Sequence, residues 1–333
     1  MDDTAPSLVV VGASAGGVEP LKEILGSLPS DLPAAVAVVL HVPASGSRLP
    51  QILNRDGGLR ATHAVDGEPL LAGRIYVAPP DNHLLVRDSR CVVVRGPREN
   101  GLRPAIDPLF RSAALSFGSR TVAVVLSGAR DDGVAGAGAV STRGGCVFVQ
   151  DPSEADFPGM PASTIHRDHP DRVLPVGEIA GAVTAAVRNL SEEASVSEND
   201  RDEMSIETSY AQLDEETIER SSPPGDPSAF SCPACGGVLW EVDDGMHRFR
   251  CRVGHAYTAE SVLDEESEEI DKALWAAFRA LHERADLSAR SARRSRRTGS
   301  NRVAERLDAN AREALDQAEL IRTILLERDA SGG

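Results

Sequence analysis

The sequence predicts an α/β fold over residues 1–190: a doubly wound, mainly parallel sheet. Two observations predict it. Short apolar runs at residues 8–11, 35–40, 121–126 and 146–149 alternate with stretches of helical spacing, which is the pattern of a parallel sheet wound by helices. The runs are apolar at every position, as in strands that are covered on both faces.

Length and charge narrow the class of protein. The chain has 333 residues, 41% of them hydrophobic, and a net charge of −16, which is typical of a soluble globular protein with two domains. So acidic a chain is a poor partner for nucleic acid or an anionic membrane. Because no apolar run approaches the roughly 20 residues that span a bilayer, we expect a cytoplasmic protein without direct membrane insertion.

The first strand ends in a turn of small residues that opens a helix. Ser14 stands between Gly12 and Gly16, and Gly17 precedes the helical stretch 18–25. This matches the G-x-S-x-G elbow, which exposes a serine hydroxyl beside the N–H groups of a helix start. A degenerate phosphate or dinucleotide loop is the alternative, but Ser14 occupies the place of its second glycine.

The next elements follow in order. Strand 35–40 ends at His41, and short strands at 74–78, 83–86 and 91–94, separated by turn residues, predict a hairpin at one sheet edge. A helix with proline just inside its start covers 108–115. Strand 121–126 leads to Asp131 and Asp132, and helix 134–142 and strand 146–149 continue the alternation.

Ser14, His41 and Asp132 each follow the carboxyl end of a predicted strand. Ligands of doubly wound sheets bind beyond these ends, so the three side chains are expected to emerge along one edge. A hydroxyl nucleophile, an imidazole base and a carboxylate that orients the base are the parts of a hydrolytic triad. The oxyanion of the reaction would lie near the N–H groups at the start of Ala15-Gly16-Gly17.

Several of these assignments have alternatives. His41 alone would be read as a structural histidine, and His83 is a rival base that better suits a pocket wall or a hydrogen-bonding role. Asp131 and Asp132 cannot be separated by chemistry, because either one could cap the next helix. Arg103 and Asp107 either line the pocket or shape the turn before their helix.

Dispersed motifs in one order give a specific resemblance over about residues 7–190. They are Val-Gly-Ala-Ser-Ala-Gly-Gly at 11–17, His-Val-Pro at 41–43, the segments 96–114 and 126–133, Gln-Asp-Pro at 150–152 and Gly-Met-Pro at 159–161. Together they resemble the catalytic domain of the CheB family, the protein-glutamate methylesterases of bacterial chemotaxis.

The resemblance implies roles for the site residues. Ser14 would be the nucleophile, His41 the base and Asp132 the third member, with no cofactor for catalysis. The family hydrolyses glutamyl methyl esters on the cytoplasmic helices of chemoreceptors, and many members deamidate receptor glutamines. Family members often have threonine and methionine where this chain has Ala15 and Ala129, which bears on the oxyanion region and the pocket shape.

The resemblance also implies partners and control. Methylated chemoreceptor helices, and other chemosensory proteins, would be the partners. Typical members carry an N-terminal receiver domain, and with the nucleophile at residue 14 we expect none here. Activity is then either unregulated or controlled by the C-terminal part or by another chain. The competing hypotheses are a signalling adaptor that keeps the fold for binding and an esterase with a different substrate.

The rest of the chain predicts a linker, a metal module and a helical pair. Residues 191–228 are acidic and polar, as in a flexible linker with a short ordered piece near 204–213. In a module at 229–260, Cys232, Cys235, Cys251 and His255 have the spacing of a closed structural zinc site. Residues 261–329 predict an antiparallel helical hairpin, broken at 293–302, for packing or partner binding.

Overall fold

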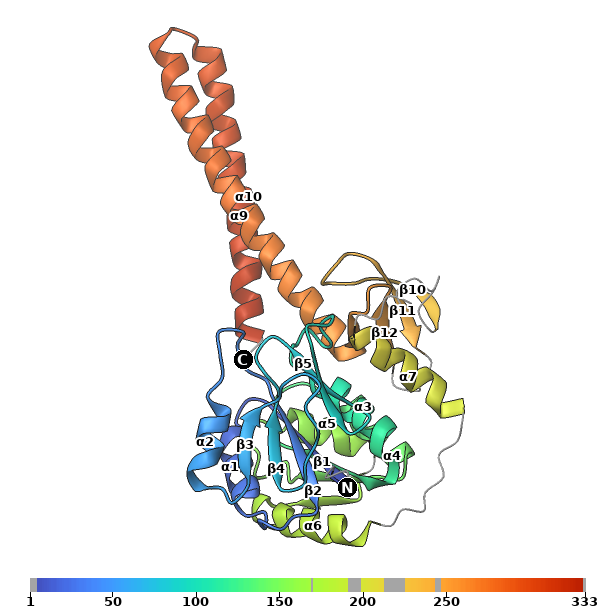
Figure 1. The fold of residues 1–333 in the computed structure, drawn as a ribbon. Coiled ribbons are helices and arrows are strands. Elements are labelled where there is room, and N and C mark those ends of the chain that lie inside the picture. Colours follow the sequence, from blue (N-terminus) through green and yellow to red (C-terminus); the bar gives the residue numbers. More distant parts are fainter. Residues whose placement is uncertain (1–4, 169, 191–198, 213–224, 243–246, 332–333) are drawn as a thin grey trace. The chain divides into compact units, whose positions relative to one another are not determined.

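The computed structural model describes residues 5–168, 170–190, 199–212, 225–242 and 247–331 (Figure 1). The chain divides into two compact units, Met1–Val262 and Leu263–Gly333. The first unit holds the sheet that carries the predicted triad, together with the Cys/His module. Of the described helices, none combines the length and the apolar character needed to cross a membrane.

The main sheet of the described chain has seven strands in the order β3-β4-β2-β1-β7-β8-β9. All of its strand pairs are parallel. The strands are β1 (Ser7–Ala13), β2 (Ala34–Leu40), β3 (Arg60–His63), β4 (Arg74–Val77), β7 (Thr121–Val125), β8 (Cys146–Gln150) and β9 (Arg172–Leu174). The chain runs outward from β1 to one side first and then, through β7, to the other. The predicted doubly wound α/β fold is confirmed.

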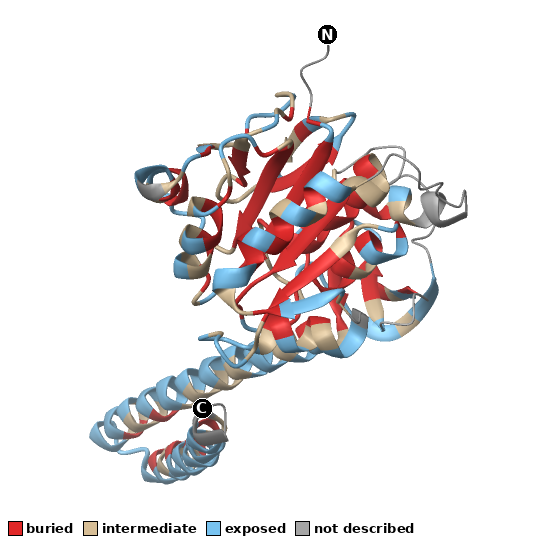
Figure 2. Cartoon of the chain, turned by 90° about the horizontal axis from the view of Figure 1, so that it is seen from below, coloured by how far each residue is buried: buried red, intermediate tan, exposed pale blue. Residues whose placement is uncertain are grey.

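Helices cover both faces of this sheet, so that it has two apolar cores (Figure 2). One face packs on α1 (Val18–Gly26), α2 (Leu49–Asp56) and α6 (Val176–Asn189), and the other on α3 (Ile106–Phe117), α4 (Val134–Thr142) and α5 (Gly159–Asp168). The side chains of β1 alternate between the two: Val9 and Val11 enter the first core, Leu8 and Val10 the second. This double burial is why the strands are apolar at every position.

The predicted hairpin forms, but away from the main sheet. Strands β5 (His83–Arg87) and β6 (Arg90–Val94) are antiparallel and make a two-stranded sheet of their own. The edge position that we expected for them is taken by β3, which pairs in parallel with β4. The hairpin packs on α3 instead: Ser112 Oγ accepts a hydrogen bond from the amide of Val86 at 3.0 Å. A short 3-10 helix, Gly118–Arg120, links α3 to β7.

The expected linker contains a helix that docks on the first unit. Helix α7 (Asn199–Ala211) packs against α3, and both Glu207 and Tyr210 are buried. Residues 191–198 and 213–224 of the predicted linker lie outside the described residues. This ordered piece agrees with the expectation near 204–213, and it begins earlier.

A second, antiparallel sheet follows in the order β10-β11-β12-β13. Its strands are β10 (Asp226–Ser231), β11 (Val238–Val242), β12 (Arg248–Cys251) and β13 (Ala256–Thr258). Leu239, Phe249 and Tyr257 pack with Cys232 and Cys251 in a small core. So small a core is what a metal site commonly reinforces.

The last two helices are α9 (Ala259–Arg297) and α10 (Asn301–Ser331). Gly299, with φ at +76°, makes the turn between them. Arg328 pairs with Asp271 at 2.6 Å and Arg296 with Asp308, so each end of one helix meets the opposite end of the other. The predicted antiparallel hairpin is present, with a turn shorter than the expected break.

Candidate active site

The register of the parallel strands brings the first two site residues together. Ala13 of β1 lies opposite Leu40 of β2, and the amide of His41 donates to the carbonyl of Ala13 at 3.1 Å. The next residue of each strand, Ser14 and His41, therefore leaves the sheet at the same point. Strand β7 pairs with the other side of β1, and its following loop carries Asp132 to the same edge.

The three side chains form one hydrogen-bonded chain. His41 Nδ1 lies 2.9 Å from Ser14 Oγ, and His41 Nε2 lies 2.8 Å from Asp132 Oδ2. Because the carboxylate accepts the Nε2–H, Nδ1 of the neutral ring is free to accept a proton from the serine. The structure thus brings together Ser14, His41 and Asp132, as the sequence predicts, with Nδ1 facing the nucleophile.

Asp132 is held by more than the histidine. Its side chain is 1% exposed, Oδ2 accepts the amide of Ile106 at 2.7 Å, and Oδ1 accepts Asn100 Nδ2 at 3.2 Å and the amide of Asp107 at 3.3 Å. Burial raises the pKa of Asp132, but the hydrogen bond and charge interaction with His41 and the N–H donors outweigh it, so that its pKa is lowered. The site therefore keeps this carboxylate ionised.

The neighbouring Asp131 has another role. Its Oδ1 accepts hydrogen bonds from Thr258 Oγ1 at 3.0 Å and Ser261 Oγ at 3.4 Å. Among the described residues, the acid that contacts His41 is Asp132. The geometry thus separates two acids that the sequence left equivalent. Burial raises the pKa of Asp131 to about 6, opposed by the hydrogen bond from Thr258.

This raised pKa gives a prediction for Asp131→Asn. The folded protein binds the proton of Asp131 more tightly than the unfolded chain, so its stabilising effect is full below pH 4 and lost as pH rises through about 6. We expect the free energy of unfolding of the wild type, relative to Asp131→Asn, to fall between pH 4 and pH 7. Urea unfolding at several pH values measures it, and a difference that rises with pH would contradict the assignment.

The turn after β1 supplies candidate oxyanion donors. The amide of Ser14 donates to Ser127 at 2.9 Å and that of Gly17 to Ser14 at 3.0 Å. In the part of the chain that the structure describes, the amides of Ala15 and Gly16 carry no such bond, and they lie where the helix α1 begins. Both therefore suit the oxyanion role that the sequence predicts for this turn.

Gly16 cannot carry a side chain without moving the turn. Its φ is +70°, and an added Cβ would lie 2.7 Å from Asp156 Cβ and 2.8 Å from Ser127 Oγ. We expect Gly16→Ala to cost about 1–3 kcal/mol of stability and to lower kcat more than it raises KM. Gly46→Ala is the control, because its φ is also positive at +139° but no atom lies within 4 Å of its added Cβ. Equal losses of kcat in both variants would contradict a role for the turn.

Two of the predicted pocket residues turn out to brace backbone. His83 has no exposed surface; its Nε2 donates to Pro97 at 2.8 Å and its Nδ1 accepts the amide of Ala105 at 3.2 Å. Burial lowers its pKa, so this ring is neutral and is not a second base. Arg103 pairs with Asp81 at 2.7 Å and donates to the carbonyl of Gly96 at 2.8 Å.

The other two predicted pocket residues differ from each other. Asp107 Oδ1 accepts the amides of Gly133 at 3.1 Å and Gly136 at 2.7 Å, which caps α4. Burial, with the nearby charge of Asp132, raises its pKa well above the usual range. Ala129 is exposed in the loop between β7 and Asp132.

The sequence reasoning missed two neighbours of the triad. Asn100, 3% exposed, places Nδ2 between Asp107 and Asp132, 3.2 Å from each. Gly128 lies beside the nucleophile, since an added Cβ there would be 2.8 Å from Ser14 Cβ and 2.1 Å from Met160 Sδ. Asn100 lies in the segment 96–114 that carries part of the resemblance, but its partners are remote in sequence, so no local pattern could assign it a role.

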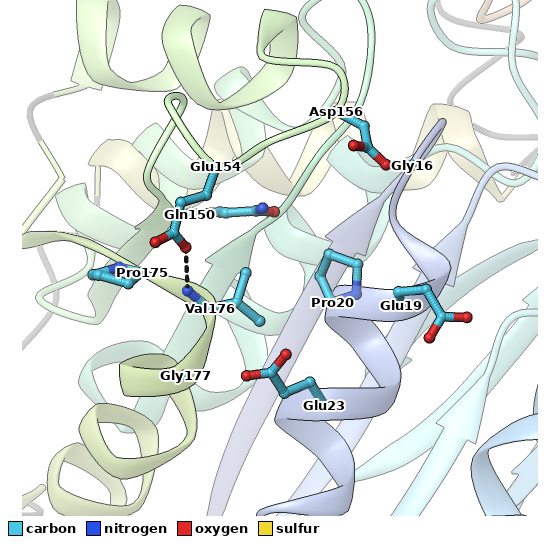
Figure 3. Close-up of a pocket in the computed structure, with 10 residues that line it drawn as sticks. All are labelled: Gly16, Glu19, Pro20, Glu23, Gln150, Glu154, Asp156, Pro175, Val176 and Gly177. Carbon is cyan, nitrogen blue, oxygen red and sulfur yellow. Dashed lines mark hydrogen bonds between the residues drawn. The ribbon is translucent and has the colours of Figure 1, made fainter.

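A groove of about 540 Å³ lies beside Gly16 (Figure 3). Gly16 lines it, together with residues of α1, the loop after β8 and the start of α6. Four carboxylates surround it, those of Glu19, Glu23, Glu154 and Asp156, and the Glu154 carboxylate accepts the amide of Val176 at 3.2 Å. None of the triad residues lines this groove.

The Cys/His residues converge as predicted. The ligand atoms of Cys232, Cys235, Cys251 and His255 all lie within 4.8 Å of one another. The sulfur atoms of Cys235 and Cys251 are 3.7 Å apart, and His255 Nδ1 is 3.7 and 3.5 Å from the sulfur atoms of Cys232 and Cys251. Tetrahedral zinc with bonds of about 2.3 Å to sulfur needs S···S distances of about 3.8 Å. The residues therefore fit a closed structural zinc site.

Known proteins match the first part of the chain. The family model for CheB methylesterase matches residues 9–183. The catalytic domain of the Thermotoga maritima CheB methylesterase is 34% identical in sequence, covers 54% of this chain and 97% of its own, and superimposes with a TM-score of 0.52.

Curated relatives of the chain are named as methylesterases too. A protein-glutamate methylesterase/protein-glutamine glutaminase 2 of Methanosarcina mazei is 34% identical over 191 residues, 55% of this chain and 52% of its own. One of Hydrogenovibrio crunogenus is 37% identical over 195 residues, 56% of this chain and 51% of its own. The chain thus spans about half the length of these relatives. With the family model covering more than half of its residues and the triad assembled within the matched part, this chain belongs to the CheB methylesterase family.

Proposed function

We propose that the chain hydrolyses glutamyl methyl esters on the cytoplasmic helices of chemoreceptors by a serine acyl-enzyme mechanism. The observation that carries this is the hydrogen-bonded chain from Ser14 through His41 to Asp132 at the carboxyl edge of the sheet. The names of the relatives support the substrate class. An adaptor that only bound partners would need neither a base at hydrogen-bond distance from the serine nor a buried carboxylate behind it.

Each residue of the triad has a role in the proposed hydrolysis. Ser14 Oγ attacks the ester carbonyl while His41 Nδ1 takes its proton, and the ionised Asp132 stabilises the imidazolium that forms. The imidazolium then protonates the departing methoxide, which leaves as methanol. Water attacks the acyl-enzyme with His41 as base again, and the glutamate is released. The amides of Ala15 and Gly16 would hold the oxyanion in both steps.

The same sequence of steps deamidates glutamine, with ammonia as the leaving group. We include this activity in the proposal, because the relatives carry the glutaminase name and His41 would protonate either leaving group.

The test is methanol release from a methylated receptor fragment, run beside small methyl esters of similar structure. We expect the receptor fragment to react with the higher kcat/KM. Preference for the small esters would indicate another substrate, and no turnover of either by protein that is folded would favour the adaptor.

We also propose that the Cys232, Cys235, Cys251 and His255 site holds structural zinc. The inter-ligand distances given above support it. Zinc would supply no chemistry to the ester, and its part is to hold two turns of the small sheet together. Purified chain with about one zinc per protein supports the site; reduced thiols without metal contradict it.

A further inference from the structure

We propose that the β10–β13 module positions the catalytic carboxylate through Asn100, so that folding of this module around its metal site supports the triad. The inference rests on the proposed function in that Ser14, His41 and Asp132 are taken as the working triad. It makes Asn100 a positioning residue and gives the Cys/His site control over hydrolysis.

Backbone hydrogen bonds join β13 of the module to residues 98–100, which precede α3. The amide of Ala256 in β13 donates to Arg98 at 3.3 Å, and the amide of Asn100 donates back to Ala256 at 2.8 Å. Residues 98–100 thus continue the small sheet along its β13 edge, where Glu99 and Ala256 form a parallel bridge. The segment before α3 is therefore held by the module, not only by the catalytic domain.

The side chain of Asn100 connects β13 to the triad carboxylate. Its Oδ1 accepts the amide of Thr258 at 3.1 Å, which fixes the side-chain amide and aims Nδ2 at Asp132 Oδ1 and Asp107 Oδ2. One residue thereby touches β13 at one end and the triad carboxylate at the other. With φ at +53°, Asn100 also occupies a backbone conformation that asparagine tolerates well.

A buried ion cluster fastens the module beside this contact. Glu99 binds Arg111 of α3 at 2.7 Å and Arg250 of β12 at 3.3 Å, while Glu207 of α7 binds Arg248 of β12 at 2.6 Å. Of these five side chains, Arg248 is 12% exposed and the others 5% or less. Separating the module would take Arg248 and Arg250 from their carboxylate partners and leave Glu99 and Glu207 with Arg111 alone, which is costly for buried charges. The docked arrangement is therefore the stable one.

The metal site lies next to the residues of the module that hydrogen-bond to Asn100. Cys251 ends β12, His255 precedes β13, and the amide of Cys251 donates to the carbonyl of His255 at 2.9 Å. These two ligands bracket the turn that sets the position of Ala256 and Thr258. A module with so small a core depends on its metal to fold, so metal loss releases the contacts to Asn100.

The chemical consequence follows from the donors of Asp132. Without Nδ2 of Asn100, Oδ1 keeps only the long hydrogen bond from the amide of Asp107, and the carboxylate is both less fixed and easier to protonate. A hydrogen bond to a charged group corresponds to roughly a tenfold change or more. We expect kcat to fall by about this factor with KM little changed.

The first test is Asn100→Gly, which removes the side chain and suits the positive φ. The expected result is the fall in kcat together with a shift of the acid limb of the pH profile to higher pH, because Asp132 has lost a donor. Asn100→Asp, which puts a second charge beside Asp132, should lose more. Asn301→Gly, an exposed position, is the matched control. A variant with unchanged kcat and pH profile would overturn the positioning role.

The second test addresses the metal in the full-length chain. Cys232→Ser and zinc removal from the wild type should lower zinc content, increase amide hydrogen exchange in residues 98–102 and slow the labelling of Ser14 by a fluorophosphonate. Cys146→Ser, outside the cluster, is the control. Labelling and exchange that do not change when zinc is lost would overturn the inference.

The labelling reagent separates the two proposals, since it reports the activated serine without any receptor. Labelling that depends on Asn100 and zinc, with no turnover of methylated receptor, overturns the proposed substrate and supports the inference. Turnover of methylated receptor that is the same with and without the Asn100 side chain or zinc supports the proposed substrate and overturns the inference. A metal-loaded wild type that does not label at Ser14 overturns both.

Discussion

Replacing Ser14 by alanine is expected to lower kcat for methyl-ester hydrolysis by about 10⁴-fold or more, because no other group stands where the acyl-enzyme bond must form. His41 Nδ1 lies 2.9 Å from the hydroxyl oxygen of Ser14, where it can take the proton of the nucleophile. Stopped assays of methanol release with the purified variant measure the loss, and mass spectrometry of a labelled sample should show no adduct at residue 14.

The fold should survive this change. Ser14 is only partly buried, and removing its hydroxyl leaves the backbone bonds of the turn in place, so thermal unfolding is expected close to that of the wild type. Ser153→Ala is the matched control, an exposed serine whose hydroxyl contacts Asp151, and it should keep full activity. Turnover by Ser14→Ala above a thousandth of the wild-type rate, in a preparation free of other esterases, would refute the nucleophile assignment.

The sheet and the triad could be predicted because local sequence determines them. Strands buried on both faces leave continuous apolar runs, and the rule that sites lie beyond the carboxyl ends of parallel strands needs only the order of the elements. Ser14, His41 and Asp132 directly follow or closely trail such runs. Choosing Asp132 over Asp131 needed either the family resemblance or the structure, because both acids have the same chemistry and adjacent positions.

Interactions between remote segments could not be predicted. The partners of Asn100 are Asp132 and Thr258, 32 and 158 residues away, and nothing in the periodicity of the chain links them. For the same reason the expected ordered piece near 204–213 gave no sign that Glu207 is buried against three arginines. The hairpin β5–β6 was recognised from its turns, but its separation from the main sheet depends on β3, a short strand without a strong apolar signal.

Asp132→Asn is the second change with a large expected effect, a loss of about 10⁴-fold in kcat. An asparagine keeps the shape of the side chain, but its NH2 group meets donors in either orientation. Placed at Oδ2, the NH2 group faces the amide of Ile106 and His41 Nε2, which forces the ring proton onto Nδ1, so that this nitrogen can no longer accept from Ser14 Oγ. Placed at Oδ1, it faces the donors of Asn100 and Asp107. In both orientations the negative charge that stabilises the imidazolium is lost.

The adjacent Asp131→Asn supplies the comparison, since it changes the same charge one residue away. It keeps an oxygen for Thr258 and is expected to stay within an order of magnitude of wild-type kcat. Both variants should be assayed with methylated receptor and labelled with the fluorophosphonate, so that loss of turnover is matched to loss of serine activation. If Asp131→Asn were the more damaged of the two, or if Asp132→Asn labelled at the wild-type rate, the carboxylate at 132 would not be the group that orients His41.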